Sequence, residues 1–364
     1  MRSRSLFIGL FALGAAGLAA CGENATEPST RVEPGPTGPE LAVASNSWLI
    51  KAKTPVNRTN MAVATVTNAA GQSVVYVIGG LTTTNMPSEK VMAYNVATNT
   101  WTYRSSLPAR LAGSNGAGVI NGKIYVSGGY SNYGGDFPGR SLLLYDPATN
   151  TWTPKRDIPV AKSVPGDPYS DNYYAMGNGV TGVIGGKLYV VSGCFQSQDP
   201  WGYFETCSPL FFRYNPATNG WTRLPNPFPP DAIGPTIGGV IAGKFYVMAA
   251  SQYTGDTYMA SYDPATNRWT PEVPLGLPRP GAASAVLGGK LYVFGGARYN
   301  ASKDAMDVLA IAIRYDPATR TWTRRADMPS ARQGIAASKV SLNGQERIEV
   351  LGGTGTGNNL QYIP

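Results

Sequence analysis

The chain has 364 residues, with 30 lysines and arginines against 22 aspartates and glutamates, a formal net charge of +8, three cysteines and no histidine. The positive charges are scattered and do not form runs, so we expect no nucleic-acid partner. The missing histidine excludes Ser-His-Asp catalysis and the usual zinc and copper sites, and it removes the commonest general base. We therefore expect neither a metal nor another cofactor.

Residues 1–20 have the organisation of a targeting signal. Arg2 and Arg4 precede an apolar stretch from Leu6 to Ala16, and the segment Leu18-Ala-Ala-Cys21 ends it with small residues before a cysteine. This ending resembles a bacterial lipobox, which implies cleavage before Cys21 and lipidation of that cysteine. An ordinary signal peptide with an incidental cysteine is the alternative. No other apolar run approaches the ~20 residues of a spanning helix, so we expect membrane attachment through the lipid anchor only.

Residues 21–43 contain four prolines and two glycines among Pro28 to Pro39 and have little apolar surface. Such a segment cannot bury enough area to fold, so we predict a lipidated flexible tether that precedes a domain at residues 44–364. Gly22 follows the cysteine, where an aspartate would suggest retention in the inner membrane. We therefore expect the cell envelope as the location, and the outer membrane over the inner one.

An eight-residue segment that runs from a tyrosine to a tryptophan occurs five times in this domain. Its copies are Tyr94 to Trp101, Tyr145 to Trp152, Tyr214 to Trp221, Tyr262 to Trp269 and Tyr315 to Trp322. Two of the copies read Tyr-Asp-Pro-Ala-Thr-Asn-x-Trp, and the other three differ from this pattern at one or two positions. Pro, Asp and Asn favour a tight turn, and Tyr and Trp favour the strands on either side of it. The tryptophans lie 51, 69, 48 and 53 residues apart, a period typical of propeller blades.

An apolar strand that ends in paired small residues precedes each of the five copies, and a sixth such strand lies near the end of the chain. These strands end at Val77-Ile-Gly-Gly80, Val126-Ser-Gly-Gly129, Val191-Ser-Gly-Cys194, Val247-Met-Ala-Ala250, Val293-Phe-Gly-Gly296 and Val350-Leu-Gly-Gly353. Together with the Tyr-Asp-Pro and Trp positions, this pattern resembles the kelch-repeat family. The resemblance implies an all-β fold, a six-bladed kelch-type β-propeller, and says little about function.

The domain begins and ends within a repeat. Ala44-Ser-Asn-Ser-Trp48 matches the second half of the tyrosine-to-tryptophan segment, and Tyr362-Ile-Pro364 matches its first half. We therefore predict that the N-terminal strand closes the last blade, which leaves no sheet edge open there. We expect the protein to be a monomer.

The insertions predict which face of the propeller binds a ligand. We letter the four strands of each blade a to d in chain order. The turns from strand a to b and from strand c to d are short. The b–c connections within blades and the d–a connections between blades contain the insertions Tyr130 to Gly139, Ile158 to Ala175, Phe195 to Ser208 and Ala297 to Asp307. Long loops on a rigid scaffold commonly carry binding sites. Their aromatic residues can stack on sugars or anchor a peptide, although they can equally pack the loops onto the propeller. The candidates are Tyr133, Tyr173, Trp201, Tyr203 and Tyr299.

Cys194 and Cys207 flank the blade 3 insertion, with twelve residues between them. If Cys21 is lipidated, these are the two remaining thiols of an exported protein, in an oxidising compartment. We predict that they form a disulfide.

A cation recurs shortly after a proline in five d–a connections, at Arg58, Arg110, Lys162, Arg279 and Arg332. In kelch domains this position often lies near the axial mouth, so the resemblance implies a partial ring of positive charge that could bind carboxylates. The alternative is that each arginine bonds carbonyls or an acid of its neighbouring blade. We take Arg58, Arg110, Arg279 and Arg332 as candidate ligand-binding residues.

These features favour a surface-anchored, non-catalytic recognition module whose partner is a glycan or a protein. We identify no catalytic residue. Two alternatives stay open at this point. One is a kelch-type sugar mutarotase or epimerase that acts on an acidic sugar with Arg and acidic residues. The other is a purely architectural envelope protein.

Overall fold

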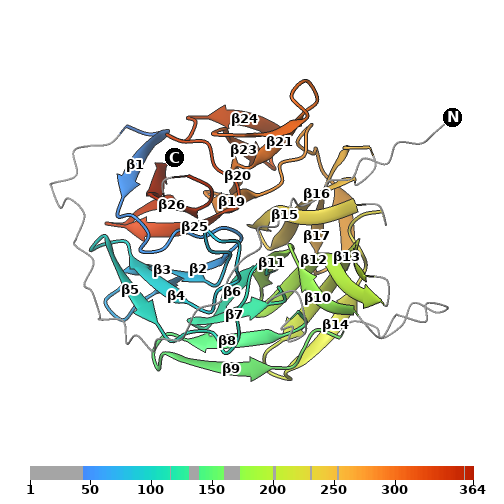
Figure 1. The fold of residues 1–364 in the computed structure, drawn as a ribbon, viewed down its shortest axis with the longest axis horizontal. Coiled ribbons are helices and arrows are strands. Elements are labelled where there is room, and N and C mark those ends of the chain that lie inside the picture. The colour runs from blue at the N-terminus through green and yellow to red at the C-terminus, as the bar shows by residue number, and fades with distance from the viewer. Residues whose placement is uncertain are drawn as a thin grey trace, which may run out of the picture.

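The computed structural model describes residues 44–114, 116–130, 139–159, 173–199, 202–229, 232–251, 254–355 and 357–364. Within these ranges every regular element is a strand, and no helix is long and apolar enough to cross a membrane. Six antiparallel sheets of four or five strands are arranged around a common centre (Figure 1), and one further sheet in the described residues has two strands. The prediction of a six-bladed β-propeller is confirmed.

Blades 1, 2 and 3 follow one another along the chain. Blade 1 contains β2 (Ala62–Thr67), β3 (Ser73–Ile78), β4 (Val91–Asn95) and β5 (Thr100–Arg104). Blade 2 contains β6 (Ala117–Ile120), β7 (Lys123–Ser127), β8 (Leu142–Asp146) and β9 (Thr151–Lys155). Blade 3 contains β10 (Tyr173–Gly177), β11 (Val180–Ile184), β12 (Lys187–Asp199), β13 (Gly202–Asn215) and β14 (Gly220–Leu224).

Blades 4, 5 and 6 complete the ring. Blade 4 contains β15 (Ala232–Ile241), β16 (Lys244–Ser251), β17 (Thr257–Asp263) and β18 (Arg268–Pro271). Blade 5 contains β19 (Ala282–Leu287), β20 (Lys290–Gly295), β23 (Ala312–Asp316) and β24 (Thr321–Arg325), and a separate hairpin of β21 (Ala297–Asn300) and β22 (Ala305–Val308). Blade 6 contains β25 (Ile335–Leu342), β26 (Gln345–Gly352), β27 (Asn359–Ile363) and β1 (Ser47–Lys51).

The outer strand of blade 6 comes from the beginning of the described chain. β1 pairs antiparallel with β27, from Ser47 opposite Ile363 to Lys51 opposite Asn359. Figure 1 shows β1 beside the C-terminal strands. Blade 6 thus joins segments that are about 300 residues apart in the sequence.

Each outer-strand tryptophan bonds its blade to the preceding one. The indole Nε1 of Trp101 donates to the Ala52 carbonyl at 3.1 Å, and that of Trp152 donates to the Ser105 carbonyl at 2.9 Å. The same bond occurs at the other four tryptophans, from Trp221 to Arg156, Trp269 to Pro225, Trp322 to Val273 and Trp48 to Ala326. The repeat therefore encodes contacts between blades as well as the hairpin within each blade.

The tyrosine of the same segment makes the second recurring bond. Tyr94 donates its hydroxyl to Asn99 Oδ1 at 2.7 Å, and Tyr145, Tyr214 and Tyr262 donate to Asn150, Asn219 and Asn267. These tyrosines are fully buried, so an unpaired hydroxyl would be costly. Each of the asparagines also has a positive φ, which Asn tolerates better than other residues with a side chain.

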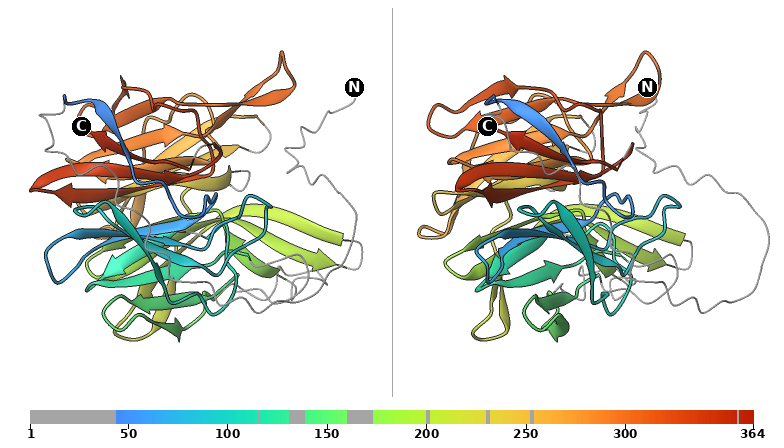
Figure 2. Two further views of the ribbon diagram at one scale, coloured as in Figure 1. Left: turned by 60° about the vertical axis from the view of Figure 1, so that its left-hand side comes forward. Right: turned by 90° about the vertical axis from the view of Figure 1, so that its left-hand side faces the viewer.

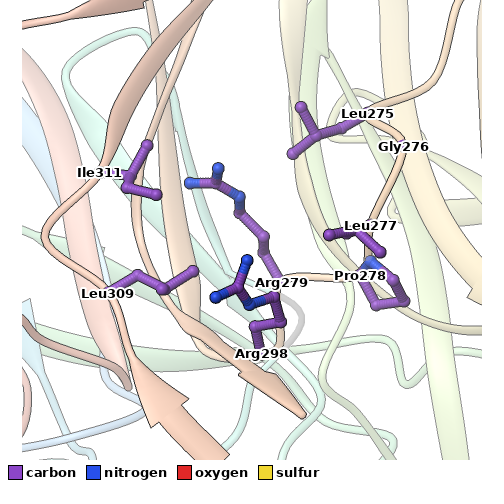
Figure 3. A pocket seen from close by; sticks show the side chains of 8 residues that line it. All are labelled: Leu275, Gly276, Leu277, Pro278, Arg279, Arg298, Leu309 and Ile311. Atoms are coloured by element: carbon purple, nitrogen blue, oxygen red, sulfur yellow. The ribbon is translucent and has the colours of Figure 1, made fainter. Parts of the chain in front are cut away.

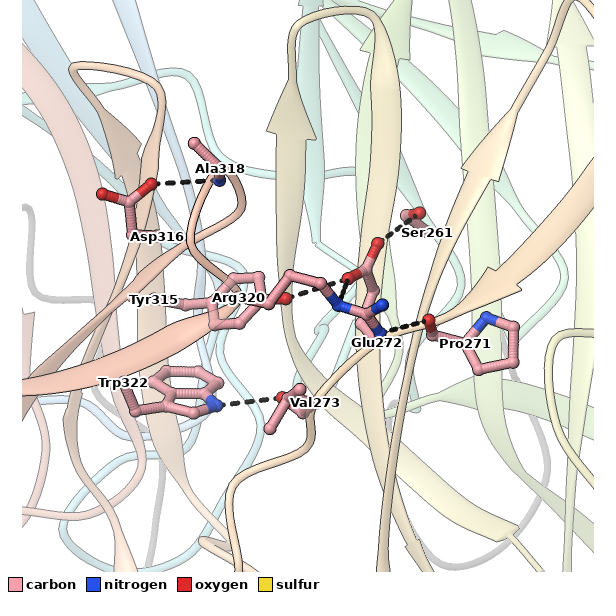
Figure 4. Close-up of polar contacts among 9 residues, drawn as sticks. All are labelled: Ser261, Pro271, Glu272, Val273, Tyr315, Asp316, Ala318, Arg320 and Trp322. Atoms are coloured by element: carbon pink, nitrogen blue, oxygen red, sulfur yellow. Dashed lines mark hydrogen bonds and ion pairs between the residues drawn. The ribbon is translucent and has the colours of Figure 1, made fainter.

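Blade 5 satisfies its tyrosine in another way, because Arg320 replaces the asparagine (Figure 4). The Tyr315 hydroxyl donates instead to Glu272 Oε2 at 2.9 Å, and Ser261 Oγ donates to Glu272 Oε1 at 2.8 Å. Arg320 Nε lies 3.5 Å from the same carboxylate, and its Nη2 donates to the Pro271 carbonyl. One acid of blade 4 thus replaces the amide acceptor.

The paired glycines permit close contact between successive blades. Gly80 N–H donates to the Leu111 carbonyl at 2.7 Å, and Gly353 N–H donates to the Arg58 carbonyl at 2.7 Å. A Cβ on the first glycine of either pair, Gly79 or Gly352, would overlap that same carbonyl oxygen, and both glycines have positive φ. Both constraints require glycine at these positions.

Two segments predicted as loops contain paired strands. β12 and β13 continue their ladder through Cys194 opposite Cys207 to Asp199 opposite Gly202, and β10 pairs with the extended part of β12. The Ala297 to Asp307 segment lies largely in the β21–β22 hairpin. The expectation of irregular loops was wrong there, because aromatic and β-branched residues suit strands, and an existing ladder can be extended without a new nucleus. Figure 2 shows both hairpins extending on the same side of the propeller.

Candidate binding site on the loop face

The b–c and d–a connections lie on one side of the propeller, which we call the loop face. Its connections are long: in blade 5, residues 272–281 lead into β19 and residues 296–311 connect β20 to β23. The a–b turns of blades 2 to 6, by contrast, contain two residues each, such as Asn121-Gly122 and Gly288-Gly289. The chain's structural variety is therefore concentrated on the loop face.

The two connections of blade 5 enclose a pocket of about 240 Å³. Figure 3 shows the two arginines of its lining between apolar side chains from both connections. The lining consists of Leu275, Gly276, Leu277, Pro278, Arg279, Arg298, Leu309 and Ile311. No acidic residue is among them, so the pocket combines aliphatic walls with two positive charges.

Arg279 has unsatisfied bonding capacity at this pocket. Its Nη1 is buried and has no hydrogen-bond partner among the described residues. Burial lowers the pKa of Arg279, and the neighbouring Arg324 and Arg298 lower it further, against the opposing effect of Asp327. An anion beside Arg279 would relieve this repulsion and supply the missing acceptor.

Arg298 reaches the pocket from the first strand of the β21–β22 hairpin. Asp307 lies opposite it in the register, but the two carboxylate oxygens of Asp307 already accept from Asn300 Nδ2 at 2.7 Å and Lys303 Nζ at 2.8 Å. Within the described residues, no ion pair or hydrogen bond involves the Arg298 side chain. Its guanidinium is therefore available to a ligand.

The other face of this hairpin is apolar and exposed. Tyr299 and Met306 lie opposite each other in the register and are 46% and 40% exposed, and Leu277 at the pocket is 52% exposed. Neighbouring residues of a strand point to opposite faces, so Tyr299 and Met306 point away from Arg298. The Tyr299 hydroxyl donates to Asp304 Oδ1, which orients the ring. Of the aromatic candidates, Tyr299 is placed on the surface of the loop face.

The remaining aromatic candidates give less structural information. Tyr133 and Trp201 lie outside the described residues, as does Cys21. Tyr173 and Tyr203 lie on β10 and β13, whose backbones are described at these positions without their side chains.

The four candidate arginines occupy different environments. Arg332 is 1% exposed, and it donates from Nη1 to the Asn358 carbonyl at 2.6 Å and from Nε to Ser330 Oγ at 2.9 Å. Arg58 is 4% exposed, and its Nε and Nη1 are buried without a partner. Burial lowers the pKa of both side chains. Arg110 is exposed and lies 3.4 Å from Glu89.

Arg110 does not occupy the same structural position as Arg58 and Arg332, because its place in the fold is shifted by one residue. In blade 2 the carbonyl that accepts from the preceding glycine pair belongs to Leu111, whereas Arg58 and Arg332 supply this carbonyl in blades 1 and 6. The spacing from proline does not reveal this shift. Sequence reasoning selected Arg279 but not its partner Arg298, because only the fold of the hairpin brings the two together. Among the described residues, no cluster of three or more metal-ligating side chains occurs.

Comparison with known proteins finds Kelch motifs and kelch-like relatives. The family profile described as Kelch motif matches residues 59–108 and 278–329, and a second Kelch motif profile matches residues 114–159. Kelch-like protein terF of Aspergillus terreus is 29% identical over 271 residues, which cover 70% of this chain and 54% of that protein. Kelch-like protein 23 of Homo sapiens is 26% identical over 262 residues, which cover 71% of this chain and 40% of that protein.

The chain thus spans about half the length, or less, of these curated relatives. Among solved structures, that of YjhT matches with a TM-score of 0.61 at 17% identity, covering 85% of this chain and 94% of that one. At this identity the match supports the fold alone.

Proposed function

Because the chain belongs to the kelch-repeat family, whose propellers commonly mediate protein–protein interactions, we propose that it is a non-catalytic recognition module that binds a protein partner through its loop face. The observation that carries this proposal is the concentration of long connections, exposed apolar side chains and unpaired arginines at blade 5. Apolar anchors beside unsatisfied charges are typical of residues that dominate the binding energy of an interface.

The proposed partner covers Leu277, Tyr299 and Met306. Leu277 lies at the pocket with the two arginines, and Tyr299 and Met306 lie on the other face of the β21–β22 hairpin, so the partner contacts both faces. Apolar contact supplies affinity and charge supplies orientation. Tyr and Met are enriched at interfaces, since Tyr buries a large area at low entropic cost and Met adapts to irregular surfaces. A glycan that stacks on Tyr299 is the alternative ligand.

Photo-crosslinking from defined positions tests this proposal. A photoreactive amino acid replaces Met86, Leu277 or Met306 on the loop face, and Ala97 or Ala148 in the c–d turns of the opposite face serves as the control. We expect one protein to be captured from the loop-face positions and not from the controls. Capture from both faces alike, or loop-face binding to a glycan array without any captured protein, would reject a protein partner on this face.

We further propose that the module is lipid-anchored at Cys21 and located in the cell envelope, preferably at the outer membrane. The support for this comes from the signal-like residues 1–20 and the small residues before Cys21. A Cys21→Ser variant should lose incorporation of labelled fatty acid and leave the membrane fraction. Retention of both properties in the variant would reject the anchor.

A further inference from the structure

Blades 5 and 6 use the same arginine position differently. The registers Val350 opposite Leu360 and Val293 opposite Ile313 make Asn358 of blade 6 the counterpart of Ile311 in blade 5. The Asn358 carbonyl accepts from Arg332, whereas the Ile311 carbonyl accepts from the Gly295 N–H at 2.9 Å. The Ile311 carbonyl thus accepts a backbone N–H, and Arg279 Nη1 has no hydrogen-bond partner among the described residues, whereas Arg332 Nη1 bonds the Asn358 carbonyl.

The preceding blade also holds Arg279 less closely than other blades hold their counterparts. Gly296 N–H donates to the Arg332 carbonyl, and Gly353 N–H donates to the Arg58 carbonyl. Blade 4 has alanines at its corresponding pair, and Ala249 and Ala250 remain in ladders with β15 and β17. A pocket opens beside the segment from Leu275 to Arg279, and the connection that contains the β21–β22 hairpin adds Arg298 on its other side.

We propose that this pocket binds a carboxylate of a partner protein, carried by a side chain or chain end with aliphatic neighbours. The inference rests on the proposed function and specifies the chemistry of the partner at blade 5. Two guanidinium groups can hold both oxygens of a carboxylate through charge-assisted hydrogen bonds. Leu275, Leu277, Leu309 and Ile311 surround these groups with aliphatic surface.

The size and polarity of the pocket favour this ligand class. Its volume is roughly that of eight water molecules in the liquid, enough for a carboxylate with a short aliphatic stem. A doubly charged phosphate would lose more hydration against these apolar walls than a singly charged carboxylate. Leu277 is exposed at the pocket, and Tyr299 and Met306 are exposed on the other face of the β21–β22 hairpin, so a protein that contacts the hairpin covers more of this surface than a small free acid does.

Hexanoate is a suitable probe because it joins a carboxylate to an aliphatic stem, and hexanamide is its uncharged counterpart. Binding to the full chain is measured by calorimetry for the wild type and for Arg279→Met, Arg298→Met and Arg110→Met. Arg110→Met is the matched control, since it removes an exposed loop-face arginine in another blade. We expect millimolar binding of hexanoate, at least tenfold weaker binding of hexanamide, and at least a tenfold loss in the first two variants only.

Equal binding of the two probes, no binding of hexanoate, or an equal loss in Arg110→Met would overturn the carboxylate site. Arg298 lies on a surface hairpin, so its variant is informative even if Arg279→Met fails to fold. Whether the carboxylate belongs to a protein is tested by measuring how tightly the partner captured by crosslinking from Met306 binds the Arg298→Met variant. Unchanged affinity of that partner for Arg298→Met would refute a protein carboxylate here, while the recognition function would stand. Failure of all loop-face crosslinks alongside specific hexanoate binding would instead reject the recognition function and, with it, the protein source.

Discussion

The hydroxyl of Tyr362, near the C-terminal end, donates a 2.8 Å hydrogen bond to Oδ1 of Asn46, near the beginning of the described chain. This is the tyrosine-to-asparagine bond of the other repeats, divided between the two ends of the domain. The same oxygen accepts the Ala326 N–H at 2.8 Å, so Asn46 also connects blade 6 to blade 5. Trp48 completes the repeat by packing against Tyr362, with ring centroids 5.0 Å apart.

Replacing Asn46 with glycine should destabilise the propeller at the junction of blades 5 and 6. The variant loses two hydrogen bonds but keeps a residue that accepts the φ of 58°. We expect a loss of about 2 kcal/mol in the free energy of unfolding, read from denaturant curves. Asn85→Gly is the matched control, because Asn85 also has a φ of 58° and lies exposed in a blade 1 loop. Equal losses in the two variants would contradict the role of Asn46.

Glu349 is fully buried in blade 6, where Gln361 donates to its Oε1. Burial raises the pKa of Glu349 to about 7, while the hydrogen bond from Gln361, the nearby Asn359 amide and the charges of Lys51 and Arg347 act in the opposite direction. The unfolded chain releases this proton near pH 4.5, whereas the folded protein keeps it until about pH 7. Its contribution to stability is therefore full below pH 4.5 and is lost as the pH rises to about 7.

A Glu349→Gln variant removes this titration while it retains a similar shape. Relative to the wild type, we expect little change in the unfolding free energy near pH 4.5 and a gain that approaches about 3 kcal/mol at pH 8. The difference between variant and wild type is measured across pH 4 to 8, which cancels the other titrating groups. A difference that is constant over this range would show that Glu349 does not titrate as described.

Glu272 supports blade 5 from the end of blade 4, and its side chain is 10% exposed. Glu272→Ala should leave the Tyr315 hydroxyl without its acceptor and cost about 2 kcal/mol or more, because that hydroxyl is buried. Glu346→Ala is the control, since Glu346 forms an exposed pair with Lys339 that should contribute less than about 1 kcal/mol. Thermal unfolding of both variants tests whether Glu272→Ala loses more stability than Glu346→Ala. A larger effect at Glu346 would refute this account of the blade junction.

Cys194 and Cys207 are directly opposed in the β12–β13 register, which is a backbone arrangement that a disulfide can join. We predict that neither thiol reacts with an alkylating reagent in unfolded, unreduced protein and that both react after reduction. The closed loop should contribute about 3 kcal/mol to stability by the loop-entropy model. Mass spectrometry of the alkylated peptides gives the answer directly. Labelling of both cysteines before reduction would disprove the bridge.

Much of the fold could be predicted because its signals are local. The Tyr-Asp-Pro turn and the tryptophan mark the c–d hairpin of each blade, and in blade 2 the strands β8 and β9 lie on either side of this turn. The paired small residues mark the end of the second strand of each blade, as at Gly79 and Gly80 after β3.

The site was less accessible to sequence reasoning because it depends on the relation between blades. Arg279 was selected from its repeat position, but the absence of a hydrogen-bond partner at its Nη1 among the described residues depends on the folded arrangement of blade 5. Arg298 becomes its neighbour only through the β21–β22 hairpin, in a segment expected to be a loop. Arg110 has the expected spacing from proline, but Leu111 takes the equivalent position in the fold.

The most direct test of the central proposal measures the affinity of the captured partner for charged variants of the loop face. Leu277→Glu introduces an acid at the pocket and Met306→Glu introduces one on the exposed apolar face of the β21–β22 hairpin, whereas Ile50→Glu introduces one at a 63% exposed site on the outer strand β1. We predict that the dissociation constant is at least thirtyfold larger for the first two variants and changes less than twofold for the third. Equal affinity of all three, or a loss confined to Ile50→Glu, would contradict recognition through the loop face.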